Sequence, residues 1–564
     1  MIFNKNLAAA VSSAVLLMAG QAALADSTTD IVDALVSKGV LTEEEGKLIS
    51  KGATTQKNAQ PVIKEKDGAF SISSPNGKNS IQLTGRLHFD TKFNDISGDD
   101  LIPQSTSSVA TNDTDSKSMG DHFNIRRARM GVKGRLGGIA DYEIMGNFVG
   151  STALDVAYID INKYEPLGLV FGKFKVAPNL EIKTSSNNID MIERSYVSQN
   201  APEKRFGAAL HGEFPGYTYF GSAFQNNDSA LSINDNKFGT AGRATINFGE
   251  ITNNKDLVAH VGLNGYSSNY QLQTTTTSNT NSTDMASRGT LFSFTSGGQG
   301  LANLYRAQIG DVAAGQNTCS ATVSGTAAST CTTSTVAYHV ASPNATNAHA
   351  DNVGLEGILA YNNFKLQGEY SQANYKASAT SGADAIQAKV DTWYAEALWI
   401  ITGEKYSDAY KKGAFGALKP KNEFNMDAGS GYGLWELGFR VDAFDVSNTS
   451  LTAANGTRFQ GTTDGLTTGV SSGKIDTCSA APSGGSATAN STTGAGCGGG
   501  AQSYTGSIKW IMNPNMVIKA NYTYTKFDNA FAPIDIGGTR NVTTPTVNLI
   551  DSENLLMIRG QYMF

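Results

Sequence analysis

The chain has 564 residues, of which 60 are glycine, 13 are proline and only 17% are charged, a composition that argues against a set of ordinary cytosolic domains. Hydrophobic residues reach 40%, yet beyond residue 25 no run of 18 uncharged apolar residues occurs, which excludes a helical membrane protein. The formal net charge of −6 gives no overall attraction to nucleic acid, so any preference for anions must be local. We therefore expect a large, glycine-rich, all-β protein.

The first 25 residues have the features of a secretory signal peptide. Lys5 supplies a positive start, residues 7–19 are apolar, and residues 23–25 (ALA) match the small-residue cleavage pattern. We expect the mature chain to begin near Asp26. Loss of Lys5 leaves 43 of the 44 basic residues against 50 acidic ones, a net charge of −7.

Residues 30–51 predict two short helices. Ile31, Leu35 and Val36 form an apolar stripe, Gly39 ends it, and residues 42–45 (TEEE) form a capping box for the second helix. This piece could be an oligomerising coiled coil or a solvated periplasmic helix pair. The predicted organisation is thus a signal peptide over 1–25, a helical segment with its linker over 26–60, and the main body over 61–564.

The main body shows the period-two alternation of a transmembrane, antiparallel, up-and-down β-barrel, in segments of about ten residues separated by turn residues. Sixteen strands are predicted, near 81–94, 123–136, 140–148, 154–162, 169–174, 205–214, 217–226, 238–248, 257–268, 352–361, 364–375, 388–401, 432–446, 502–511, 516–527 and 554–564.

The connections between these strands alternate between tight turns and long polar segments, as periplasmic turns and external loops do in outer-membrane barrels. Tight turns are expected at 137–138, 215–216, 362–363 and 513–515. If both ends of the barrel sequence are periplasmic, the segments 95–122, 269–351, 447–501 and 528–553 lie outside.

The last predicted strand illustrates the two faces of the barrel wall. Leu556, Ile558 and Tyr562 share one face, expected to meet lipid, while Arg559 and Gln561 share the other. In the strand near 388–401, Trp393 and Trp399 lie on one face, about 20 Å apart at ~3.3 Å per residue, which suits two interfacial aromatic girdles.

The four cysteines fall in two polar, Ser/Thr/Gly-rich segments, as Cys319 with Cys331 and Cys478 with Cys497. Secretion favours a disulfide within each pair over a zinc site. Each bond would stabilise its loop by ~3 kcal/mol in the chain-entropy model. The alternative is that the cysteines are unpaired in disordered loops.

Several segments in order along the chain resemble the phosphate-selective porin O and P family. They are 126–134 (RRARMGVKG), 183–186 (KTSS), 191–195 (MIERS), 398–404 (LWIITGE), 413–421 (GAFGALKPK), 433–437 (GLWEL) and 510–514 (WIMNP). The resemblance runs from about residue 81 to the end. It implies a sixteen-stranded outer-membrane barrel, usually trimeric, with a third loop that folds inward, and an N-terminal helical piece.

Selectivity in a pore comes from charge and diameter at a constriction, so the predicted strand near 123–136 is informative. By alternation its basic residues Arg127, Arg129, Lys133 and Arg135 share one face. They must face the lumen, because arginine at mid-bilayer on the lipid side costs ~2 to 4 kcal/mol. We expect a lane of four cations for anions, with Arg126 pointing outward; the alternative is a lane neutralised by acids on facing strands or on the third loop.

In the candidate third loop, residues 175–204, Lys183 stands close before Ser185 and Ser186 in a stretch that resembles the family's phosphate-binding one. Hydroxyl groups beside a lysine are suitable oxyanion ligands. These three residues complete the predicted anion pathway.

The sequence therefore predicts an outer-membrane porin for passive diffusion of small hydrophilic solutes, with anions such as phosphate preferred, membrane lipid as surroundings and a homotrimer as assembly. No catalytic residue, metal or cofactor is expected, because the GxSxG match at 469–473 lies in a low-complexity loop without a nucleophile elbow. Two alternatives stand beside it, a non-selective general diffusion porin and a barrel-anchored adhesion or structural protein whose long Ser/Thr-rich loops are the working parts.

Overall fold

The computed structural model describes residues 32, 35–49, 60–66, 68–95, 121–150, 153–226, 238–272, 289–299, 305–309, 346–378, 385–425, 427–452, 457–460, 478–479, 499–531 and 550–564. The predicted signal peptide, the GxSxG match at 469–473 and three of the cysteines (Cys319, Cys331 and Cys497) lie outside these residues. Cys478 is described by its backbone alone. The chain forms two compact units, residues 1–82 with 134–139 and residues 83–133 with 140–564.

The first unit contains the predicted helical segment and a hairpin of β1 (Val62–Lys66) and β2 (Ala69–Ser73). The capping box is confirmed, since the Glu45 N–H donates to Thr42 Oγ1 at 3.2 Å and the Thr42 N–H donates to the Glu45 carboxylate at 2.9 Å. Gly39 ends the preceding helical turn with φ +71°, a conformation that favours glycine. Both local predictions for this segment are therefore correct.

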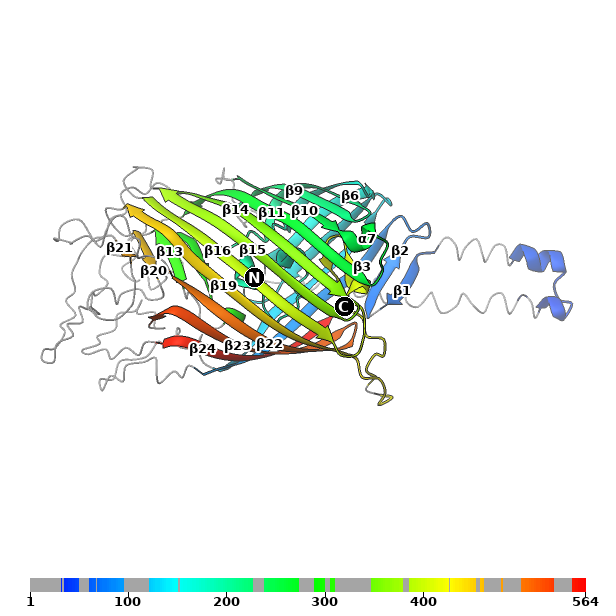
Figure 1. The fold of residues 1–564 in the computed structure, drawn as a ribbon. Coiled ribbons are helices and arrows are strands. Elements are labelled where there is room, and N and C mark those ends of the chain that lie inside the picture. Colours follow the sequence, from blue (N-terminus) through cyan, green and yellow to red (C-terminus); the bar gives the residue numbers. More distant parts are fainter. Residues whose placement is uncertain are drawn as a thin grey trace, which may run out of the picture. The chain divides into compact units, whose positions relative to one another are not determined.

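Sixteen strands form a closed antiparallel barrel (Figure 1), and each of them overlaps one of the sixteen predicted strands. Each strand pairs with its neighbours along the chain, and the last strand pairs with the first, from Leu555↔Asn94 to Met563↔Arg86. The strands are β3 (Ser80–Asn94), β4 (His122–Leu136), β5 (Ala140–Asn147), β6 (Ala153–Tyr164), β7 (Leu167–Lys175), β8 (Lys204–Phe214), β9 (Tyr217–Gln225), β10 (Phe238–Asn247), β11 (Leu257–Leu272), β14 (Thr346–Tyr361), β15 (Phe364–Ser378), β16 (Ala385–Ile400), β19 (Leu434–Thr452), β22 (Gly499–Asn513), β23 (Met516–Phe531) and β24 (Ile550–Met563).

The predicted tight turns have the backbone that two-residue hairpins need. Gly216 adopts φ +78° between Phe214 and Tyr217, and Asn362 adopts φ +51° between Tyr361 and Phe364. Asparagine and glycine tolerate this left-handed conformation better than other residues. All of these turns leave the barrel at the end predicted to be periplasmic.

Side chains alternate between the two faces of the wall, most regularly in β10, whose residues are exposed and buried in strict turn. In β24 the outward Leu556, Ile558 and Tyr562 are exposed, whereas the inward Arg559 and Gln561 are buried. The prediction for this strand is confirmed. A buried inward arginine shows that polypeptide, rather than water, covers this part of the inner face.

Three connections supply that cover. The third loop, residues 176–203 between β7 and β8, carries α5 (Leu180–Lys183) and α6 (Tyr196–Gln199). The connection between β11 and β14 contributes β12 (Gly289–Phe294) and η3 (Gly297–Gln299), and the one between β16 and β19 contributes η4 (Tyr406–Ala409), β17 (Tyr410–Lys411) and β18 (Ala414–Phe415).

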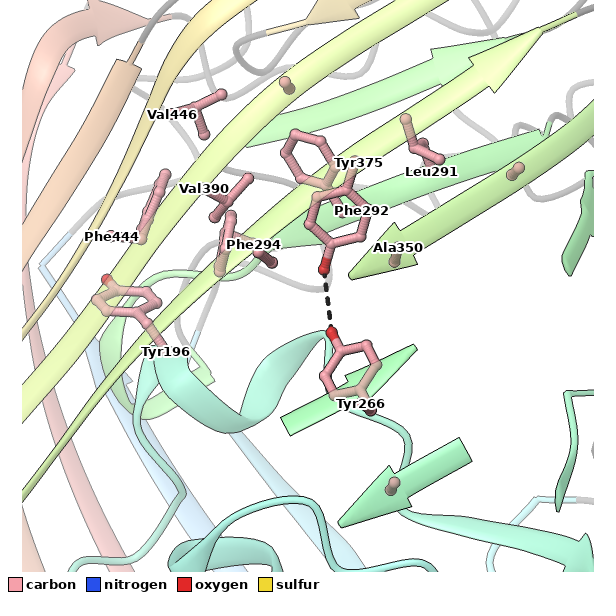
Figure 2. Close-up of a cluster of buried hydrophobic side chains, with 14 of the residues drawn as sticks. Tyr196, Tyr266, Leu291, Phe292, Phe294, Ala350, Tyr375, Val390, Phe444 and Val446 are labelled. Atoms are coloured by element: carbon pink, nitrogen blue, oxygen red, sulfur yellow. Dashed lines mark hydrogen bonds between the residues drawn. The ribbon is translucent and has the colours of Figure 1, made fainter. Parts of the chain in front are cut away.

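Two apolar clusters join these segments to the inner wall. One contains Tyr196, Phe292, Phe294, Tyr375 and Phe444 (Figure 2), and the other contains Leu180, Leu398, Tyr406, Tyr410 and Phe415. Each cluster combines residues of strands with residues of an inserted connection. The described barrel is therefore packed on the inside along part of its wall.

The remaining elements are short. β13 (Tyr305–Ile309), β20 (Thr457–Gln460) and β21 (Cys478–Ser479) form a separate four-stranded sheet with β12, and α7 (Phe248–Ile251) lies in the connection after β10. Among the described residues, no helix is long and apolar enough to span a membrane.

Gly131 allows β4 and β5 to approach closely. A Cβ atom at this position would stand 2.1 Å from the Ile144 carbonyl oxygen and 2.7 Å from the Met145 Cα atom. Backbone atoms cannot move away as the end of a flexible side chain can. Gly560 in β24 has no atom within 4 Å of the equivalent position and is a natural control.

We expect Gly131→Ala to lower the stability of the barrel by ~1–3 kcal/mol, because the strands must separate to admit the methyl group. Gly560→Ala should leave stability nearly unchanged. The measurement is the temperature at which the folded form is lost on a gel that separates folded from unfolded barrels. Equal midpoints for the two variants would contradict this account.

Candidate functional site

The third loop is held inside the barrel by ion pairs with residues of strands that are distant in sequence. Asp190 accepts from Lys365 of β15 at 2.7 Å and lies 3.4 Å from Lys509 of β22. Burial alone would raise the pKa of the Asp190 carboxyl, but the two lysines more than offset this and hold it below its usual range. Asp190 therefore stays ionised because of the two lysines of the barrel wall.

Glu193 is the second anchor of the loop and accepts from arginines of both the first and the last part of the barrel. Arg126 of β4 donates at 2.9 Å and Arg559 of β24 at 2.5 Å, while Arg127 stands 3.6 Å away. Burial opposes ionisation here too, yet these arginines hold the pKa of Glu193 well below its usual range.

The start of α5 is held by the opposite arrangement, a carboxylate of the wall that binds the loop. Glu369 of β15 accepts the backbone N–H groups of Leu180 and Glu181 at 3.0 and 2.9 Å. Glu181 in turn accepts from Ser195 and Ser198 at 2.8 Å each, which ties the two halves of the loop together. The loop is fixed at its beginning, middle and end.

These contacts bury the inner wall at β15, β22 and β24. The wall of β4 to β9, which we call the accessible side, keeps some partly exposed inward residues, although Phe174, Ser222 and Phe224 on it are buried. On the filled side, Lys365 and Arg559 have side chains that are 1% and 0% exposed. On the side formed by β4 to β9, the inward His211 and Glu213 are 28% and 36% exposed. The partial exposure of His211 and Glu213 shows that the interior is not completely filled at this part of the wall.

Five cations stand on this accessible side where the third loop meets the wall, and we call them the cationic belt. They are Arg86 of β3, Arg129 of β4, Lys175 of β7, Arg194 of the third loop and Lys204 of β8. Two carboxylates lie among them: Asp155 contacts Lys204 at 2.6 Å and Arg129 at 3.3 Å, and Glu203 contacts Arg194 at 3.4 Å and Lys175 at 4.0 Å. Glu143, the next carboxylate, accepts from the Tyr158 hydroxyl at 2.9 Å.

The predicted lane on β4 is divided between different surroundings. Arg129 is in the belt, and Lys133 is exposed. Arg127 is buried against Glu193 and so holds the loop instead of facing the accessible side. Arg135 donates to the Gly138 carbonyl in the following turn at 3.1 Å.

The prediction that Arg126 points outward is wrong. Phe123 and Ile125 are exposed on the outer face, as is Met130 further along the strand, so alternation breaks between them. Two consecutive residues, Arg126 and Arg127, therefore reach the same inward carboxylate. A strict period of two cannot represent such a break.

The predicted group of Lys183, Ser185 and Ser186 separates in the structure. Ser186 is buried and accepts from Arg86 of the belt at 3.0 Å, and Ser185 accepts the Asn187 N–H at 3.4 Å. Lys183 ends α5 and lies over the Phe220 ring of β9, with Nζ 5.7 Å from the ring centre. Burial, followed by repulsion from Arg243 and Lys412, lowers the pKa of Lys183 to about 8.

Sequence reasoning missed four of the five belt residues as pathway residues. Lys175 and Lys204 are directly opposite each other in the β7–β8 register, at the two ends of the third loop. Adjacent strand ends that flank a loop must meet, which is a signal the sequence contains. Arg86 could be found by alternation, since it shares the inward face of β3 with His88 and Asp90, both buried.

Among the described residues, no three His, Cys, Asp or Glu side chains are grouped as metal ligands. The arrangement is that of a charged passage. It can attract, orient and release a solute ion, and the residues that line it are held by the surrounding barrel.

The family model described as phosphate-selective porin O and P matches residues 103–564. The chain belongs to this family. With its closed barrel, the porin is therefore a channel protein of the Gram-negative outer membrane. The predictions of fold class, family and location are confirmed. No curated protein matches this porin.

Three solved structures to which the porin is similar have low sequence identity with it. OmpT of Vibrio cholerae gives a TM-score of 0.42 at 9% identity, with 86% of this chain and 98% of that chain covered. The anion-selective porin from Comamonas acidovorans gives 0.40 at 10%, covering 86% and 100%. The channel DcaP of Acinetobacter baumannii gives 0.40 at 9%, covering 86% and 97%.

The segments that resemble the family have identifiable structural roles in this porin. Segments 398–404 and 413–421 meet where Glu404 accepts the Lys421 N–H at 2.9 Å. Gly413, at φ +71°, brings its carbonyl to Arg243 of β10 at 2.5 Å. These segments lie at the end of the barrel that is predicted to be periplasmic.

We expect Glu193→Gln to destabilise the porin by ~3–5 kcal/mol, because the buried Arg127 loses its carboxylate and Arg559 keeps only Asp90. The control is Glu203→Gln. That carboxylate is 36% exposed, and its loss should cost ~0–1 kcal/mol. The midpoint of thermal unfolding in detergent measures both, and an unchanged midpoint for Glu193→Gln would show that the pair does not hold the loop.

Proposed function

We propose that this porin conducts small hydrophilic solutes by passive diffusion and prefers anions, with phosphate and related oxyanions as the leading candidates. The observation that supports the proposal is the cationic belt, in which five cations stand with two carboxylates on the accessible side. A local excess of positive charge at a narrow point raises the concentration of anions there and excludes cations.

The chemistry of the belt suits oxyanions. Guanidinium groups donate in a planar fork that matches two oxygens of a phosphate. The Nε atoms of Arg86 and Arg129 are buried and have no acceptor among the described residues. These buried atoms are out of reach of a solute, so any contact with an oxyanion is made by the terminal nitrogens of the two guanidinium groups. Exposed Lys133, together with Lys183, extends the positive surface along the pathway.

A general diffusion porin is the second candidate, and the ion pairs of the loop favour it. Glu193 compensates Arg127, and Asp155 compensates Arg129, so two of the four predicted lane residues are paired. Under this alternative the belt holds the loop in place and leaves ion selectivity weak.

The adhesion alternative loses part of its basis. Residues 289–294, from one of the two long Ser/Thr-rich loops, contribute Leu291, Phe292 and Phe294 to the apolar cluster inside the barrel. Such residues are not available to another surface. We also propose a homotrimer, which the family resemblance supports.

Arg129→Ala combined with Arg194→Ala should reduce anion permeability by about 4-fold per charge, the Coulomb effect of a unit charge at ~5 Å in water, and so lower the ratio of anion to cation permeability. Reversal potentials in a chloride gradient across a planar bilayer measure this ratio. Lys411→Ala, at an exposed periplasmic position, is the matched control. In the unsubstituted porin, added phosphate should block chloride current. A reversal potential near zero without block would favour the general diffusion alternative.

Lys183 should make the selectivity depend on alkaline pH. Its pKa of about 8 means that the group is charged below pH 8 and neutral above it, so anion preference should fall between pH 7 and 9. Lys183→Arg keeps its charge over this range and should remove the dependence. Reversal potentials at pH 7, 8 and 9 decide this, and an identical decline in both proteins would assign the effect to another group.

A further inference from the structure

Glu203 is the last residue of the third loop, directly before β8, and the backbone fixes its place. The Val176 N–H donates to the Glu203 carbonyl at 2.9 Å, which joins the two ends of the loop. The next residue, Lys204, is paired with Lys175 in the β7–β8 register. Glu203 is therefore held between residues of the cationic belt.

The Glu203 carboxylate is more exposed than the cations that form ion pairs in the belt. Its side chain is 36% exposed, against 25% for Lys175, 15% for Arg129, and 12% each for Arg194 and Lys204. An ion that reaches the belt therefore meets a carboxylate as well as cations.

The two cations beside Glu203 contact the same carboxylate oxygen. Arg194 Nη1 lies 3.4 Å from Oε1, and Lys175 Nζ lies 4.0 Å from it. Lys175 is bound more closely to the carbonyls of Ile182 and Thr184, at 2.8 and 3.0 Å. Among the described residues, no N–H or O–H group donates a hydrogen bond to this carboxylate. Glu203 therefore keeps its capacity to accept a hydrogen bond from a solute.

The Glu203 carboxylate carries its charge at neutral pH. Burial would raise the pKa of this group, but Arg194, Lys175 and Lys204 lower it to about 2. An ionised carboxylate only accepts hydrogen bonds. It repels an anion that has no proton to donate, whereas it can bind one that does, through an O–H···O⁻ hydrogen bond.

We infer that Glu203 makes the belt favour oxyanions that keep a proton near neutral pH, such as hydrogen phosphate, over those that keep none, such as sulfate. The cations attract both kinds of oxyanion, and the carboxylate separates them by repelling the fully deprotonated kind. Glu203 is thus a specificity-determining residue. This inference rests on the proposed anion preference, because a carboxylate can discriminate only among anions that the belt admits.

The test is the block of chloride current by phosphate and by sulfate at pH 8, where both are mainly dianions and phosphate alone carries a proton. In the intact porin, phosphate should block at a concentration about 10-fold below that of sulfate, because one hydrogen bond to a charged group is worth roughly that factor or more. In Glu203→Gln the ratio of the two blocking concentrations should approach 1, because the amide neither repels sulfate nor lacks a donor for it.

Glu213→Gln is the matched control for the test. The Glu213 side chain is also 36% exposed and also lies 3.4 Å from a cation, Lys412, but it is outside the belt. Its substitution should leave the ratio of blocking concentrations at the value of the intact porin.

The same measurements separate this proposal from the proposed function. If neither anion blocks the chloride current, the proposed preference for oxyanions is wrong. If sulfate blocks the intact porin as well as phosphate does, or if Glu203→Gln leaves the ratio unchanged, the role of Glu203 is overturned while the anion preference stands. An equal fall of the ratio in Glu213→Gln would also overturn it, because a carboxylate outside the belt would then have the same effect.

Discussion

The arrangement of this porin depends on ion pairs between carboxylates of the third loop and cations of the inner wall. A loop of this length would ordinarily stay in solvent, because burying its polar backbone and charges is costly. Lys365, Lys509 and Arg559 change this balance, since the loop carboxylates Asp190 and Glu193 pair with these cations of the wall. The ion pairs therefore stabilise the buried charges of both the loop and the wall. Their positions determine where the loop narrows the barrel.

The same pairing decides which cations are left to act on solutes. Arg127 forms an ion pair with Glu193, although an arginine at this place on the strand would suit an anion pathway. Arg86, in contrast, donates to the Ser186 hydroxyl of the loop and not to a carboxylate. Under the proposed function, selectivity depends on the positive charge that is not paired with the carboxylates of the loop. The number of basic residues along one strand does not tell how many of them remain unpaired once the loop is in place.

The barrel itself could be predicted from the sequence because its signals are local. Alternation and two-residue turns located all sixteen strands, since each depends on residues within about ten positions of one another. The alternation argument failed at Arg126, where the backbone departs from period two.

The path of the third loop could not be predicted from local patterns, because its contacts join residues far apart in the sequence. Glu193 and Arg559 are 366 positions apart, and Asp190 and Lys365 are 175 apart. The grouping of Lys183 with the serines failed because α5 ends at Lys183, which turns its side chain toward β9 while Ser186 faces Arg86.

The pairing of β24 with β3 has a consequence for the order of assembly. Arg559 belongs to the strand that closes the barrel, and it is also one of the arginines that hold Glu193. The third loop therefore cannot complete its contacts until the last residues of the chain have been synthesised and inserted. Contacts over such a separation form late, because the entropy of closing the intervening chain must be met first. A barrel that is still open at this seam has a wide interior, and the act of closing it also narrows the passage. Nascent chains would accordingly become selective only when they become complete.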